Sequence, residues 1–130
     1  MPDHDTAGLA AKVLTVSDGV VHGTREDRSG VVLVELLTEH GYDVVEQRVV
    51  ADGVENVSQA LIELSENFSG VVVTTGGTGF GPRDLTPEGT RLVLEREAPG
   101  ISEAMRLVNP LGRLSRAIAG TRGTPLIVNA

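Results

Sequence analysis

Apolar residues come in short runs that predict strands at four places along the chain. The run at 12–17 (KVLTVS) is β-branched and ends in polar residues and glycine, which is typical of a strand buried on both faces of a parallel sheet. Residues 44–50 predict a second strand, and 70–75 (GVVVTT) has the strongest strand pattern of the four. TPLIVN at 124–129 predicts a last strand.

Between these runs, apolar residues recur at steps of three and four, which predicts amphipathic helices. The first such pattern covers 32–40 and stops at Gly41, and the second covers 54–68 with Asp52 at its head. Residues 101–108 and 111–118 are also compatible with helices.

A further helix is predicted to begin at Thr86-Pro87-Glu88. These residues supply an N-cap, a proline at the first helical position and an acid near the positive end of the helix dipole. The same pattern predicts that Leu92, Val93 and Leu94 point inward.

Strands that alternate with helices indicate an α/β fold class. The crossover connections make it a doubly wound, mostly parallel sheet with helices on both faces. Ligands bind such sheets at the carboxyl ends of the strands. Three loops leave those ends, at 18–28, 51–53 and 76–84, and the last two each carry an Asp. We therefore expect the site among these loops.

The composition excludes several classes of function. A chain of 130 residues, 40% hydrophobic and 22% charged, is one globular domain. The absence of Cys excludes disulfides, thiolate nucleophiles and iron–sulfur clusters, and the three His are too far apart in sequence to predict a metal centre. Two Phe, one Tyr, no Trp and a pI near 4.8 argue against nucleic-acid binding.

Charge is unevenly distributed along the chain. Residues 1–70 hold four Lys and Arg against thirteen Asp and Glu, whereas 71–130 hold seven against five. An anionic ligand would be steered to the second half. The start has no basic segment followed by an apolar stretch, and no run of about 18 apolar residues occurs, so we expect a cytoplasmic protein without membrane contact.

Four glycines lie within the six residues 76–81, directly after a predicted strand. Backbone without side chains can approach a ligand closely there, and its N–H groups can face an anion. Neither a Walker A loop nor a dinucleotide fingerprint fits, because Pro82 and Arg83 stand where those motifs need other residues. A tight strand-to-helix turn that needs positive φ is the structural alternative.

The residues that follow these glycines favour phosphate chemistry. Arg83 can contact a phosphate bidentately while Asp84 holds a divalent metal, which suits a nucleoside triphosphate with Mg²⁺; an internal ion pair is the alternative. Asp52 alone is best interpreted as a helix N-cap. If the strands before Asp52 and Asp84 flank one crevice, both carboxylates can reach one metal–phosphate group, since adjacent strands lie about 5 Å apart.

The stretch TTGGTGFGPRDLTPEGT at 74–90 resembles the central motif of the MoaB/Mog proteins of molybdenum-cofactor biosynthesis, whose domain also occurs in gephyrin. Further matches, in order, are VSD at 16–18, DRSG at 27–30, Asp52, PGISEAMR at 99–106 and LSRAIAGTRGTPLIVN at 114–129. The resemblance covers nearly the whole chain after residue 11. We therefore expect a flexible tail over 1–11 and a single molybdopterin-binding domain over 12–130.

This resemblance implies a three-layer α/β domain that binds molybdopterin, usually as a trimer or a dimer of trimers. In the Mog branch it implies that Mg-ATP adenylylates the molybdopterin phosphate, so Mg²⁺, ATP and molybdopterin are the expected ligands. A molybdenum-insertion protein of the same pathway is an expected partner. Such a transfer needs alignment and charge neutralisation rather than a covalent nucleophile.

By matching position, the resemblance also implies site residues. Asp84 would serve metal binding and catalysis, and Asp52 the metal or ATP. Structural alternatives stay open for Ser17 as a strand end, Ser115 as a helix cap, and Glu103 as a partner of Arg106 on one helix face. The substrate- and phosphate-binding residues implied are Ser17, Asp18, Thr75, Gly76, Gly77, Thr78, Gly79, Arg83, Glu103, Ser115 and Asn129.

One departure from the family bears on function. The family continues after the LIVN strand into a Pro-Gly-Ser-Pro type loop, which lines the pterin pocket, and a further helix, whereas this sequence ends at Asn129-Ala130. Either the given sequence is a shortened piece, or the protein lacks part of the pocket, which would weaken the expectation of catalysis more than that of the fold. Two functions besides the adenylyltransferase stay open: a non-catalytic molybdopterin-binding or scaffold protein of the MoaB type, and a generic nucleotide-binding domain.

Overall fold

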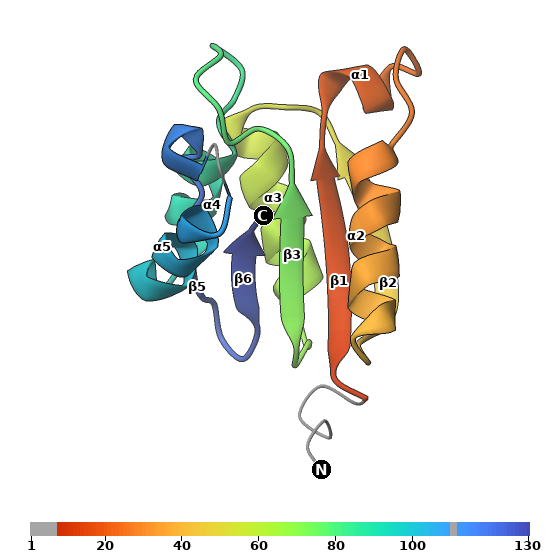
Figure 1. Cartoon of the computed structure of the whole chain (residues 1–130), viewed down its shortest axis with the longest axis vertical. Helices are drawn as coiled ribbons and strands as arrows, with labels where there is room; N and C mark the ends of the chain where they lie inside the picture. Colours follow the sequence, from red (N-terminus) through yellow and green to blue (C-terminus); the bar gives the residue numbers. More distant parts are fainter. Residues whose placement is uncertain (1–7, 110–111) are drawn as a thin grey trace.

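The structure, a computed structural model, describes residues 8–109 and 112–130, which form a six-stranded sheet with the order β2-β1-β3-β6-β5-β4 (Figure 1). The pairs β2–β1, β1–β3 and β3–β6 are parallel, whereas β6–β5 and β5–β4 are antiparallel. The strands are β1 (Ala10–Val16), β2 (Asp43–Val50), β3 (Val71–Thr75), β4 (Arg96–Glu97), β5 (Ala119–Thr121) and β6 (Leu126–Asn129). The predicted α/β class with a mostly parallel sheet is confirmed.

Helices cover both faces of this sheet. Figure 1 shows α2 in front of β1 and β2, and α3 behind the sheet. Within the described residues the helices are α1 (Asp18–Val21), α2 (Arg28–Glu39), α3 (Val54–Ser65), α4 (Thr86–Val93), α5 (Pro99–Leu107) and the single 3₁₀ turn η2 (Gly112–Leu114). None of them is long and apolar enough to cross a membrane.

The main core lies between the sheet and α3. Leu14 on β1, Val72 on β3 and Ile127 on β6 are fully buried and pack against the fully buried Leu61 and Leu64 of α3. Helix α4 packs on α3 closely, because Gly89 has no side chain: a Cβ there would lie 2.8 Å from the Cβ of Val57. This contact fixes α4, and with it the loop that precedes α4, relative to the sheet.

Helix α2 covers the other face less completely. Its Val31, Val32 and Leu36 are each about half exposed. The helix predicted over 32–40 is confirmed apart from its last residue, since α2 ends at Glu39. Its apolar face, however, is not fully buried.

The predicted helix over 111–118 is wrong. Leu111 lies outside the described residues, and only Gly112–Leu114 forms a 3₁₀ turn. After this turn the backbone finds distant partners instead of helical ones: the Arg116 N–H donates to the carbonyl of Thr78 at 3.0 Å, and the Ile118 N–H donates to Oδ1 of Asn129 at 3.1 Å. These bonds lead the chain into β5.

Three smaller expectations also fail, and one boundary differs. Helix α3 ends at Ser65 rather than at 68, because Asn67 adopts a left-handed φ of 48°. The loop at 18–28 contains the one-turn helix α1. Leu92 is 70% exposed, although Val93 is buried as predicted. Residues 1–7 of the expected tail over 1–11 lie outside the described residues, and Ala10 and Ala11 belong to β1.

The predicted caps of two helices differ in the structure. Thr86 is the first residue of α4 rather than its N-cap, which is Leu85. The Thr86 hydroxyl instead donates to the carbonyl of Gly76 at 2.8 Å. Gly53, and not Asp52, is the N-cap of α3. Both side chains interpreted as caps are therefore directed at the loops that follow β1 and β3.

Candidate functional site

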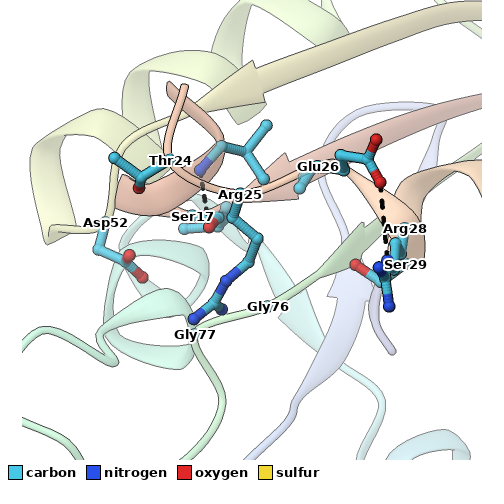
Figure 2. Close-up of a pocket in the computed structure, with 12 residues that line it drawn as sticks. Ser17, Thr24, Arg25, Glu26, Arg28, Ser29, Asp52, Gly76 and Gly77 are labelled. Atoms are coloured by element: carbon cyan, nitrogen blue, oxygen red, sulfur yellow. Dashed lines mark hydrogen bonds and ion pairs between the residues drawn. The ribbon is translucent and has the colours of Figure 1, made fainter. Parts of the chain in front are cut away.

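A cavity of about 710 Å³ opens at the carboxyl ends of the parallel strands, where the sequence predicts a site. The strand register explains why the loops meet there: Val16 of β1 pairs with Val50 of β2, and Thr15 of β1 with Thr75 of β3. Figure 2 shows the lining side chains. The lining residues are Thr15, Val16, Ser17, Val20, Thr24, Arg25, Glu26, Arg28, Ser29, Asp52, Gly76 and Gly77.

The floor of this cavity requires glycine at two successive positions. Gly76 and Gly77 have φ of 98° and 73°, which side chains rarely adopt. A Cβ on Gly76 would run into the backbone carbonyl of Val16, and one on Gly77 would run into Oγ1 of Thr86 and lie 3.2 Å from Oδ1 of Asp52. The tight turn and the close approach to a ligand, which the sequence left as alternatives, are therefore compatible with each other.

Asp18 and Asp52 hold the ends of β1 and β2 together through reciprocal bonds. The Asp18 N–H donates to Oδ2 of Asp52 at 2.9 Å, and the Asp52 N–H donates to Oδ1 of Asp18 at 3.0 Å. Ser17, just before, caps α1 by accepting the Val20 N–H at 3.2 Å. The side chain of Asp52 lines the cavity, whereas that of Asp18 turns toward Arg83.

Arg83, the predicted phosphate ligand, is already engaged by the protein. Its Nε donates to Oδ2 of Asp18 at 2.6 Å, and its Nη2 donates to Oδ1 of Asp18 at 3.1 Å and to the carbonyl of Asp52 at 2.8 Å. The hydrogen bond from Arg83 lowers the pKa of Asp18 below its ordinary value, despite the opposing effect of desolvation. The structure therefore shows the internal ion pair that the sequence offered as the alternative, with Asp18 rather than Asp84 as the acid.

Asp84 lies within its own loop. Its Oδ2 accepts the Gly81 N–H at 2.9 Å, and Cβ atoms placed on Gly79 and Gly81 would come within 3.0 and 2.9 Å of the same oxygen. Asp84 is not among the residues that line the main cavity. The premise that the strands before Asp52 and Asp84 are neighbours is wrong, because β1 pairs with both and separates them.

Sequence reasoning missed Arg116, which ties the glycine loop to α4. Its Nε donates to the carbonyl of Gly79 at 2.8 Å and its Nη2 to that of Asp84 at 2.6 Å, while Nη1 pairs with Glu88 at 2.6 Å. The guanidinium also lies 5.5 Å from the centre of the Phe80 ring. Its side-chain partners are 28 to 37 residues away in sequence, so no local pattern could have revealed the role.

Replacing Arg116 with Lys tests that role. Lys keeps the charge, but it lacks the planar guanidinium with which Arg116 bonds two carbonyls and a carboxylate at once. We therefore expect the free energy of unfolding in urea to fall by about 1 to 2 kcal/mol. Amide protons of residues 78–81 should exchange faster with solvent. Arg91→Lys is the control: Arg91 meets the exposed Glu97 at 3.5 Å, and the change should stay below about 0.5 kcal/mol. Equal effects of the two variants in both measurements would contradict the assignment.

The other predicted site residues lie apart from the main cavity. Thr75 and Ala130 line a shallow apolar groove beside α2. Ser115 and Asn129 line a small cavity of about 70 Å³, and Glu103 is exposed on α5. Arg106 does not pair with Glu103 but donates to the carbonyl of Ala117 at 2.7 Å, so the structural alternative offered for Glu103 is not formed.

The side-chain amide of Asn129 bonds to three groups within the core. Its Nδ2 donates to Oγ1 of Thr74 at 3.0 Å and to Oγ1 of Thr90 at 3.1 Å, and its Oδ1 accepts the Ile118 N–H. Asn129 is fully buried, and these three bonds join β6 to β3, to α4 and to the segment before β5.

The lining of the cavity fits a divalent metal that is bound together with substrate phosphates. The described residues contain no group of three or more His, Asp or Glu that would bind a metal by itself. Mg²⁺ usually takes only one or two carboxylates and completes its shell with water and substrate phosphates. Asp52, whose Oδ2 accepts the Asp18 N–H while its carboxylate lines the cavity, fits that pattern.

Comparisons with known proteins agree with one another. A family model described as a probable molybdopterin binding domain matches residues 12–127. The "Molybdopterin adenylyltransferase" of Helicobacter pylori J99 is 39% identical over 124 residues, which cover 90% of this chain and 70% of the relative. The "Molybdenum cofactor biosynthesis protein B" of Bacillus cereus is 37% identical over 126 residues, which cover 92% and 73%. The crystal structure of the molybdopterin biosynthesis enzyme MoaB from Thermus thermophilus superposes with a TM-score of 0.87 at 38% identity and covers 93% of this chain and 79% of that one.

Proposed function

The chain belongs to the molybdopterin-binding domain family, and from this premise we propose that it binds molybdopterin and ATP and adenylylates the molybdopterin phosphate. The observation that carries the proposal is the cavity at the strand ends, where the left-handed pair Gly76 and Gly77 lies beside the carboxylate of Asp52. A phosphate can approach the main chain of the two glycines closely here, and the carboxylate of Asp52 lies next to it.

The proposed reaction balances without any further reactant. An oxygen of the molybdopterin phosphate forms a bond to the α-phosphorus of ATP, the bond from that phosphorus to the bridging oxygen breaks, and pyrophosphate leaves. The protein must align two anionic groups and offset their charge. Main-chain N–H groups of the glycine loop and the cations around the cavity can do this without a covalent nucleophile.

We assign the acids separate roles in this site. Asp52 would hold Mg²⁺ together with substrate phosphates, since its side chain lines the cavity. When bound, Mg²⁺ supplies charge neutralisation to the phosphates. Asp84 would set the shape of the glycine loop through its bond to the Gly81 N–H, and would act on the substrate from that loop. The oligomer and the molybdenum-insertion partner implied by the resemblance remain proposals of the same kind.

Turnover by the purified chain tests the function. We expect the chain, mixed with Mg-ATP and molybdopterin, to release pyrophosphate and to give an adenylylated pterin detectable by mass. Asp84→Ala should lower the rate by about 10- to 100-fold, because the loop that approaches the phosphates loses its internal bond. No product from the chain, in an assay where an established adenylyltransferase gives product, would contradict the proposal.

A non-catalytic role is the second candidate. It is favoured by the position of Asp84, the predicted catalytic acid, which does not line the main cavity. Molybdopterin binding without pyrophosphate release, with an affinity that Asp84→Ala leaves unchanged, would select this binding role over the transferase.

A further inference from the structure

The cavity contains a cation that the sequence analysis did not single out. Arg25 follows α1, and Figure 2 shows its guanidinium extended into the cavity toward Gly77. Its main chain is anchored, because the Arg25 N–H donates to the carbonyl of Gly19 at 3.2 Å, and Thr24 donates to the same oxygen through its N–H at 2.9 Å and its hydroxyl at 3.2 Å. A Cβ on Gly19 would lie 3.2 Å from that of Arg25, so the bare glycine leaves room for the side chain.

Among the residues that the structure describes, the guanidinium of Arg25 has no acceptor, unlike the other cations of the site. Arg83 is paired with Asp18, Arg116 with Glu88, and Arg28 with Glu26 at 3.8 Å. Within residues 8–109 and 112–130, by contrast, the Arg25 side chain makes no hydrogen bond or ion pair. A cation that faces a cavity with its donors unused is ready to bind an anion.

The cavity also contains complementary chemistry. Asp52 lines it together with the hydroxyl-bearing Ser17 and the backbone of Gly76 and Gly77. A guanidinium and a carboxylate that share one cavity match a phosphate bound with a divalent cation, since the phosphate oxygens suit the fork of Arg and the metal suits the carboxylate.

We propose that Arg25 binds a phosphate group of a substrate in this cavity, in the role that the sequence suggested for Arg83. The proposal rests on the proposed function, because the phosphate belongs either to ATP or to molybdopterin. It adds that the loop between α1 and α2 supplies the phosphate ligand, although this loop lies outside the glycine motif.

Binding measured without turnover tests the proposal. The probes are ATP, inorganic pyrophosphate and molybdopterin, each titrated alone by calorimetry into the parent chain, Arg25→Ala, Arg25→Lys and Arg96→Ala. Arg96→Ala removes the same charge from the exposed edge strand β4 and is the control. We expect Arg25→Ala to raise the Kd of at least one probe by about 10- to 100-fold, Arg25→Lys to restore part of the loss, and Arg96→Ala to stay within about twofold.

The pattern of losses identifies the phosphate. Weaker binding of ATP and pyrophosphate with unchanged binding of molybdopterin assigns Arg25 to the nucleotide, and the reverse assigns it to the pterin phosphate. The proposal would be overturned if Arg25→Ala bound all three probes with the same Kd values as Arg96→Ala. It would also be overturned if the parent chain bound none of them. A parent that binds but does not turn over would contradict the transferase alone, because the Kd values still decide the role of Arg25.

Discussion

Replacing Asp52 with Asn is expected to lower kcat/KM for adenylyl transfer by at least about 100-fold while leaving the fold intact. Asn keeps an oxygen that can accept the Asp18 N–H, so the link between the ends of β1 and β2 survives. The substitution removes the negative charge. The other acid that lines the cavity, Glu26, meets Arg28 at 3.8 Å and is 83% exposed, so it cannot take over the role.

Steady-state rates with Mg-ATP and molybdopterin, together with thermal unfolding, check this expectation. Glu55→Gln is the matched control, because Glu55 lies three residues further on, in the first turn of α3, and is exposed. It should leave the rate within about twofold of the parent, as is usual for a surface charge away from special contacts. An Asp52→Asn variant with near-parental kcat/KM would remove Asp52 from the site.

Replacing Gly77 with Ala should weaken substrate binding and also destabilise the protein. The new methyl group would enter a backbone position with φ of 73° and meet Oγ1 of Thr86, whose hydroxyl and N–H both bond to carbonyls of this turn. We expect the free energy of unfolding to fall by about 2 to 4 kcal/mol, the sum of left-handed strain and overpacking. KM for the substrates should rise by about 10-fold or more, because the methyl lies beside Asp52.

Gly123→Ala separates the two effects. Gly123 has a similar φ of 63° in the turn before β6, but a Cβ there meets nothing within 4 Å. This control should cost about 1 kcal/mol of stability from the backbone alone and leave KM unchanged. Urea unfolding and substrate titrations of both variants give the comparison, and equal KM values for the two would show that Gly77 does not shape the binding surface.

Much of this fold was predictable because its signals are local. The β-branched run at Val71–Thr75 favours a strand, and the glycines after it mark a turn before α4. Alternating strands and helices then place the site at the carboxyl ends of the sheet, where the cavity lies. Family membership, predicted from the motif at 74–90, is confirmed by the family model that matches residues 12–127.

The rest depends on contacts between distant residues. Strands β4 and β5 have two and three residues, which are too few for a periodic pattern. They form because β5 pairs with β6 and β4 pairs with β5. Arg83 looked like a phosphate ligand because its partner Asp18 is 65 residues away. Arg25 was overlooked for the opposite reason: only the assembled cavity shows that its guanidinium faces a site.

The bonds that join Asp18, Asp52 and Arg83 have a consequence for folding. They connect residues 34, 31 and 65 positions apart, so we expect the loops around the cavity to come together only after β1, β2 and β3 have paired. Long loops must be closed before these contacts yield any stabilisation, which places them late in assembly. A partly folded chain therefore has no binding site, and a ligand that enters the cavity stabilises the native state as a whole, with a melting temperature that rises with ligand concentration.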